Sequence, residues 1–382
     1  MKATVERVTL LKALGHVHRV VERRNTIQIL SNVLLRAEGE GLRLKATDLD
    51  VEVTEAVRAD VGTGGATTVP AHMLYEIVRK LPDGAQVSLD TGGEGASAGP
   101  GGGMTVRSGR ARFTLQTLPD SDFPDLAAGD FPHRFSLPSK DLKRLIDRTQ
   151  FAISTEETRY YLNGIFLHVV DGEGGAVLRA VATDGHRLAK VEAPAPEGAK
   201  GMPGVIVPRK TVAEVQKLLE DGDKPVSVAL SPTKIRFQFG DEDSGLVLTS
   251  KLIDGTFPDY QRVIPSANDK RLVVDKGDFV GAVDRVSTVS SERGRAVKLS
   301  IADGRMTLSV TNPDSGSAVE ELEVDYGSPA LDIGFNARYL LDIAAQIGTG
   351  DAEFMLADPG SPTLIRESGE QSALYVLMPM RV

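Results

Sequence analysis

The chain has 382 residues, of which 41% are apolar, 44 are Lys or Arg and 53 are Asp or Glu, giving a formal net charge of −9. This length and apolar content predict two or three domains and exclude global disorder, and the absence of cysteine excludes disulfides, thiolate metal sites and a cysteine nucleophile. No apolar run is long enough to span a membrane and the first residues lack a signal-peptide pattern, so we expect a soluble, cytoplasmic protein.

Short sequence markers recur in the same order along the chain and predict three homologous domains. A Thr-Asp or Thr-Asn pair ends at Asp48, Asp184 and Asn312, which are 136 and 128 residues apart. A second marker ends at Pro70, Pro208 and Asn336, and a Phe-Pro marker begins at Phe123 and Phe257 and degrades to Met378-Pro379. The expected domains cover residues 1–130, 131–266 and 267–382.

Each repeat is expected to begin with an amphipathic helix, because apolar residues recur at helical spacing over residues 10–21, 139–150 and 279–286. Ser139 is the expected N-cap of the second of these helices. Alternating strands follow in each repeat, and Asp303-Gly304 predicts a hairpin turn between residues 297–301 and 306–310.

A second helix is expected to begin near Pro70, Pro208 and Asn336, again followed by strands. Each repeat therefore holds two sub-repeats of a helix plus antiparallel strands. The predicted class is α+β, with helices on one face of the sheets. The glycine-rich stretch over residues 92–103 is predicted to be a flexible loop rather than a phosphate-binding loop.

Familiar enzyme motifs are missing: the sequence has no P-loop ending and no Gly-x-Ser-x-Gly nucleophile elbow. His16 and His18 are two positions apart and would not face each other on a helix, so we expect no metal site and no cofactor. Asp184 and His186 could be part of a hydrolase site, but the same marker at Asp48 has no histidine, which favours a turn at the end of a strand. A hydrolase and a repeat-built scaffold without a DNA role stay open as alternatives.

Positive charge is concentrated in the expected helices. They sum to +7, which leaves −16 on the rest of the chain. A net negative charge normally argues against a nucleic-acid partner. A basic helical surface on an otherwise acidic chain can nevertheless bind a rod-shaped anion such as duplex nucleic acid on that one surface.

Several longer motifs resemble the β sliding clamp family, the processivity subunits of bacterial replicative DNA polymerases. The resemblance extends from Met1 to Val382. It rests on the segments 160–164 (YYLNG), 182–189 (ATDGHRLA), 205–210 (VIVPRK), 249–252 (TSKL), 257–260 (FPDY) and 378–381 (MPMR). The glycine-rich stretch and Val382 as the last residue are the main departures.

The resemblance implies a non-catalytic, head-to-tail homodimeric ring with helices lining the hole and sheets outside. Such a ring would encircle double-stranded DNA without regard to sequence. It would also tether the replicative polymerase, the clamp loader, and other polymerases and repair proteins through a short peptide.

Three sets of site residues follow from the resemblance. The client-peptide set comprises Leu162, Thr183, Gly185, His186, Arg187, Leu188, Pro258, Arg262, Val263, Val376, Met378, Pro379, Met380 and Arg381. The DNA-binding set comprises Arg24, at the end of the first basic helix, with Arg159, Tyr160 and Tyr161. The dimer-interface set comprises Phe113, Leu115, Thr288 and Val289.

Overall fold

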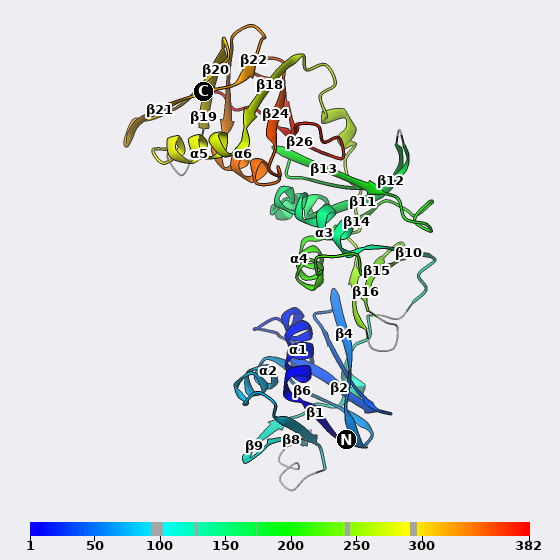
Figure 1. Ribbon diagram of the computed structural model, residues 1–382. Helices are drawn as coiled ribbons and strands as arrows, with labels where there is room; N and C mark the ends of the chain where they lie inside the picture. The colour runs from blue at the N-terminus through cyan, green and yellow to red at the C-terminus, as the bar shows by residue number, and fades with distance from the viewer. Residues whose placement is uncertain (93–101, 127–128, 173, 241–244, 291–295) are drawn as a thin grey trace. The chain divides into compact units, whose positions relative to one another are not determined.

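The computed structural model describes residues 1–92, 102–126, 129–172, 174–240, 245–290 and 296–382 (Figure 1). The chain forms two compact units, one of residues 1–142, 196–199 and 213–252, the other of residues 143–195, 200–212 and 253–382. Most of the predicted glycine-rich loop, residues 93–101, lies outside the described residues.

The first unit contains two antiparallel sheets. The five-stranded sheet has the order β5-β1-β7-β8-β9, with β1 Lys2–Glu6, β5 Asp60–Thr63, β7 Gln86–Asp90, β8 Gly103–Ser108 and β9 Ala111–Gln116. The eight-stranded sheet has the order β10-β15-β16-β17-β4-β3-β2-β6. Its strands are β2 Asn32–Glu38, β3 Gly41–Thr47, β4 Val51–Arg58, β6 Gly65–Pro70, β10 His133–Pro138, β15 Pro225–Leu230, β16 Lys234–Phe239 and β17 Leu246–Lys251.

The second unit also contains two antiparallel sheets. Its nine-stranded sheet has the order β14-β11-β12-β13-β26-β25-β24-β18-β22. These strands are β11 Gly164–Gly172, β12 Gly175–Thr183, β13 Arg187–Pro194, β14 Val205–Pro208, β18 Lys270–Asp275, β22 Asp325–Tyr326, β24 Asp351–Leu356, β25 Thr363–Glu367 and β26 Ala373–Leu377. The four-stranded sheet has the order β21-β20-β19-β23, with β19 Ala296–Ala302, β20 Arg305–Asn312, β21 Gly316–Glu323 and β23 Leu331–Asn336.

The helices recur twice per repeat, as the sequence predicts. The α-helices are α1 Arg7–Val17, α2 Ala71–Lys80, α3 Ser139–Asp147, α4 Arg209–Leu218, α5 Lys276–Ser287 and α6 Ala337–Ala344. In the first unit α1 and α2 lie side by side against one face of the strands (Figure 1). Leu10, Leu14 and Val17 of α1 are fully buried there. This arrangement confirms the predicted α+β class.

Three local expectations are wrong. Ser139 does not cap α3 but is its first residue, and its hydroxyl donates to the Glu220 carbonyl. The helix ends at Asp147 rather than near residue 150, and a 3-10 turn over Gln150–Ala152 follows. The first helix ends at Val17, so Arg24 lies in an irregular segment beyond it.

The repeated Thr-Asp markers form the same turn twice, which confirms that they are strand-end turns. The Asp48 carboxylate accepts from the backbone N–H groups of Asp50 and Val51 at 2.9 and 2.7 Å. Asp184 accepts from His186 and Arg187 in the same way at 2.9 and 3.0 Å. Both carboxylates are therefore used to close a turn.

The predicted hairpin across Asp303-Gly304 is also confirmed, since β19 and β20 pair on either side of it. Asp303 has φ of 48° and Gly304 has φ of 73°, and two successive positive φ angles are typical of the type I′ turn that matches strand twist.

Candidate functional site

Part of the client-peptide set forms a buried apolar floor in the second unit. Leu162, Leu188 and Val376 are 2–4% exposed and share one hydrophobic cluster. The cluster also contains Phe257 and Tyr260, from the segment that follows β17. Residues more than 200 positions apart in sequence thus contribute to one floor.

Other apolar members of the client-peptide set are exposed. Met378 is 40% exposed, Met380 37% and Val263 49%. Flexible methionine side chains suit a surface that takes more than one partner. The predicted members Pro258 and Arg381 are also exposed.

The C-terminal segment is held against two different elements rather than frayed. The Met378 N–H donates to the His186 carbonyl at 2.9 Å, and the Met380 N–H donates to the Gly334 carbonyl at 2.8 Å. A Cβ at Gly334 would lie within 3 Å of both Val382 and the Met380 carbonyl. Only glycine leaves room for the tail on β23.

Arg187 holds the turn of the site in place. Its guanidinium donates to Asp184 at 3.2 Å, to Asp342 at 2.5 Å and to the Phe151 carbonyl at 2.8 Å. It also lies 4.3 Å from the centre of the Tyr339 ring. With these contacts made and only 9% of the side chain exposed, Arg187 acts as a positioning residue in this structure.

Sequence reasoning missed Tyr339 and Asp342, which both lie on α6. Asp342 is 155 residues from Arg187, and nothing in the local sequence signals the pairing. The Tyr339 ring also stacks on His186, with the ring centres 6.3 Å apart.

The DNA-binding set does not form one cluster. Arg159 donates twice to Glu156, at 2.9 and 2.7 Å, and its guanidinium covers Gly185 of the client-peptide set. Tyr160 is 53% exposed and packs edge-to-face on Tyr161. Arg24 is exposed in the other unit.

The dimer-interface set comes from one sheet edge and from the segment that follows a helix. Phe113 and Leu115 belong to β9, the last strand of the five-stranded sheet, and Phe113 is 37% exposed. Thr288 and Val289 directly follow α5, and the Val289 carbonyl accepts from Asn312 at 3.0 Å.

The histidines considered for metal binding have other partners. His16 pairs with Glu55 at 2.8 Å, and His18 bonds the Leu14 carbonyl. No group of three or more potential metal ligands occurs among the described residues. No described helix is long and apolar enough to cross a membrane.

His168 gives the second unit a predictable pH response. Burial, with the nearby Arg179 charge, lowers its pKa from 6.5 to about 4, and its Nε2 lies 3.0 Å from the Tyr260 hydroxyl. The unfolded state binds this proton more tightly than the folded state does. The stabilising contribution of neutral His168 is therefore complete above pH 6.5 and falls as the pH drops toward 4. We expect a loss of about 2 kcal/mol after allowing for solvent screening.

Urea unfolding between pH 7 and pH 4 measures this loss. His168→Gln removes the titrating group and should flatten the profile over that range. Burial opposes ionisation of Glu370, but Ser372, Arg148 and Arg144 lower its pKa to about 2. Its stabilising contribution is therefore complete above its ordinary pKa of 4.5 and is lost only as the pH falls from 4.5 toward 2. An equally steep profile in the glutamine variant would contradict the assignment to His168.

Three family models cover nearly the whole chain. The N-terminal, central and C-terminal domains of the DNA polymerase III beta subunit match residues 1–127, 136–259 and 261–381. The chain belongs to the beta sliding clamp family. Beta sliding clamps from Caulobacter vibrioides and Escherichia coli are 55% and 40% identical to it, each over the whole of both chains.

Solved clamp structures have the same fold. A sliding clamp from Bartonella birtlesii with bound griselimycin is 56% identical with a TM-score of 0.94, and both chains are covered completely. A Pseudomonas aeruginosa clamp with a ligand is 40% identical with a TM-score of 0.92, also over both whole chains. The chain therefore has the three-domain clamp fold and is a non-catalytic processivity factor, so the hydrolase alternative is wrong.

Proposed function

We propose that two copies of this clamp close head to tail into a ring around duplex DNA. The observation that carries the proposal is a junction that is made twice within one chain and left open once. β4 pairs with β17 in the first unit, and β13 pairs with β26 in the second. In the described residues, the third copies of these strands, β21 and β9, are unpaired sheet edges.

The strand registers say which residues would meet at the third junction. Val53 lies opposite Leu248, and Ala189 lies opposite Tyr375. Each repeat has one strand that leads directly into its first helix, and the strand registers can be followed from that strand across the sheet. Followed in this way, Phe113, Leu248 and Tyr375 occupy the same position in the three repeats. The same comparison, made from the strand that leads into the second helix of each repeat, gives Ala318 the position of Val53 and Ala189.

Burial supports this correspondence. Leu248, Tyr375, Val53 and Ala189 are at most 1% exposed, whereas Phe113 is 37% exposed. A second copy that placed Ala318 opposite Phe113 would bury that ring as its counterparts are buried. A heterologous contact of this kind closes after two copies if the rotation is right.

Charge also favours this pairing of edges. The β8–β9 hairpin carries exposed Arg107, Arg110 and Arg112, and β21 carries Glu320, Glu321 and Glu323. Opposite charges on adjacent strands stabilise the correct register and disfavour pairing of like edges.

The helices supply a moderately basic surface for DNA. α1 and α4 each carry a net charge of +2, α2 and α3 each +1, and α5 and α6 are neutral, so the six helices carry +6. The rest of the chain carries the balance of the −9. A sliding ring needs weak contacts, because each tight phosphate contact must break at every step.

A topological test decides whether the ring encloses DNA. The clamp is loaded by its loader onto a nicked circular plasmid, which is then cut once. We expect retention on the circle and at least about 90% loss within minutes of cutting. Persistent binding to the linear form would contradict enclosure and favour ordinary affinity.

We further propose that the client-peptide set binds a short segment of the replicative polymerase, the clamp loader and other polymerases and repair proteins. Tethering raises the effective concentration of polymerase at the primer end, which is the physical basis of processivity. The proposal needs no cofactor, and the DNA it serves would place the protein in the cytoplasm. The bounds 1–130, 131–266 and 267–382 stay our proposal for the three domains.

A further inference from the structure

One row of side chains lies at the same register position on a sheet in each of the three repeats. Strands β2, β11 and β19 each begin opposite the residue that precedes a helix, and the row passes through the fifth residue of each. These residues are Arg36, His168 and Ser300. The next two strands place Arg43 and Ala56, Arg179 and Glu192, and Thr307 and Glu321 beside them.

In the second and third repeats, carboxylates compensate the row. Arg179 donates to Glu192 at 2.7 Å, and the two side chains are 13% and 18% exposed. In the third repeat neutral Ser300 and Thr307 lie between Asp332 and Glu321. Neither row leaves an arginine without a carboxylate.

The first repeat has two adjacent arginines in this row and no carboxylate beside them in the row. Arg36 and Arg43 lie directly opposite each other, an arrangement of like charges that costs stability. The position that Glu192 takes beside Arg179 is held here by Ala56, beside Arg43. Within the described part of the chain Arg43 has no ion-pair or hydrogen-bond partner, and Arg36 has only Asp120, at 3.6 Å.

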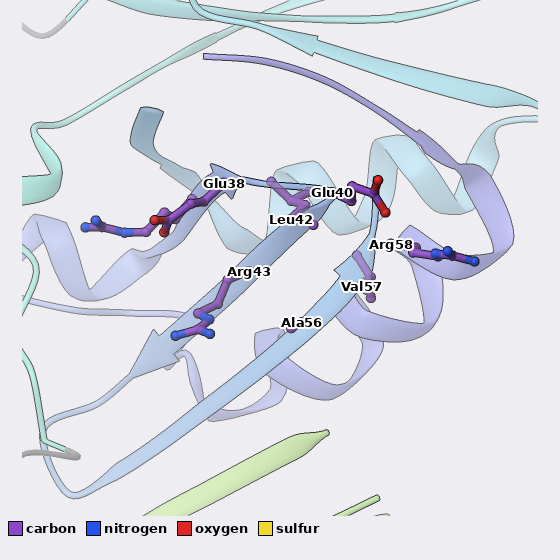
Figure 2. Close-up of a pocket in the computed structure, with 9 residues that line it drawn as sticks. Glu38, Glu40, Leu42, Arg43, Ala56, Val57 and Arg58 are labelled. Carbon is purple, nitrogen blue, oxygen red and sulfur yellow. The ribbon is translucent and has the colours of Figure 1, made fainter. Parts of the chain in front are cut away.

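An open hollow of about 370 Å³ lies over this row, and Figure 2 shows Arg43 on β3 beside Ala56 on β4. Its lining also includes Glu38, Glu40 and Arg58 toward the end of the strands. The hollow therefore offers Arg43, which has no carboxylate partner among the described residues, and Arg36, whose one carboxylate partner is Asp120 at 3.6 Å, next to two acidic side chains.

We propose that this hollow, made of Arg36, Arg43 and Ala56, binds an acidic side chain from a partner protein. The incoming carboxylate takes the place that Glu192 takes beside Arg179 in the second repeat. Glu38 and Glu40 favour basic residues on either side of that carboxylate. They oppose a continuous polyanion, so the partner is a protein segment of mixed charge rather than nucleic acid. This surface is separate from the client-peptide set, which lies in the other unit.

A labelled acetyl-Gly-Lys-Glu-Lys-Gly-amide peptide is the probe, with its Glu→Gln form as the matched ligand. Titrated into the full-length protein, it should shift the side-chain N–H signals of Arg36 and Arg43 saturably, and the glutamine peptide should not. Arg43→Ala should weaken binding at least about tenfold, the scale of one charge-assisted hydrogen bond.

Ala56→Glu tests the same idea without removing an arginine. Its carboxylate should pair with Arg43, raise the melting temperature by about 1–2 °C and weaken the peptide at least about tenfold. Thr54→Glu adds the same charge two residues away, opposite Lys45, and should change binding less than threefold. Arg305→Ala, on β20 of the other unit, should leave peptide binding unchanged.

Some outcomes would overturn the proposal. They are unchanged peptide binding in both Arg43→Ala and Ala56→Glu, or equal binding of the glutamine peptide. Inorganic phosphate or duplex DNA that shifts the two arginine signals where the peptide does not would replace the proposed partner with a different class.

Discussion

Removal of Met378–Val382 is expected to abolish binding of client peptides, at least about 100-fold by fluorescence anisotropy, while leaving the dimer intact. The deleted segment carries two exposed methionines and is fixed by backbone bonds to His186 and Gly334. The preceding strand β26 ends at Leu377 and keeps its pairing with β13 and β25. The loss should therefore be local, with a melting temperature within a few degrees of the parent.

A point variant separates the position of the tail from its presence. Gly334→Ala places a Cβ against the Val382 side chain and 2.7 Å from the Met380 carbonyl, so the tail must move although every tail residue remains. We expect a loss of peptide affinity of about tenfold or more. Gly327→Ala is the matched control, because a Cβ added at that position has no neighbour within 4 Å. Full affinity in the deletion variant would refute the site assignment.

The parts of the fold that local chemistry determines could be predicted from the sequence. Asp48 and Asp184 close the same turn because their side chains bond their own backbone, and this signal is complete within four residues. The hairpin at Asp303-Gly304 is equally local. The repeat of helices and strands followed from such signals and from apolar spacing.

The wrong expectations have two different physical causes. Ser139 has the side chain of an N-cap, but its hydroxyl donates instead to Glu220, 81 residues away. Periodicity extended the first helix through Val20 and Val21, but regular helix ends at Val17, which leaves Arg24 outside it. Apolar spacing does not show where a helix stops when the next turn is also buried.

The candidate site divides in the same way. Exposed Met378 and Met380 and the turn at Thr183 were identified through motifs, whereas the contact of Arg187 with Asp342 depends on tertiary packing. The sequence also did not predict that sheets continue from one repeat into the next. Only the strand order reveals that β17 and β26 complete sheets begun by other repeats.

Phe113→Ala is expected to convert the dimer to monomers at nanomolar concentration. Its counterparts Leu248 and Tyr375 are fully buried at the two internal junctions, so Phe113 should be buried at the junction between copies. Truncating it removes about 2 kcal/mol or more of apolar contact at each junction. A ring of two copies contains the junction twice, so the dissociation constant should rise roughly 1,000-fold.

Sedimentation velocity between about 10 nM and about 10 μM measures this shift. Met73→Ala is the matched control, since Met73 is 55% exposed on α2 and lies on neither sheet edge, and it should leave the dimer unchanged. Ala318→Arg tests the opposite side, because an arginine facing Phe113 would bury an unpaired charge. If Phe113→Ala and Ala318→Arg both stay dimeric at the lowest concentration, the copies must join through other surfaces, and the edges β9 and β21 are free for another use.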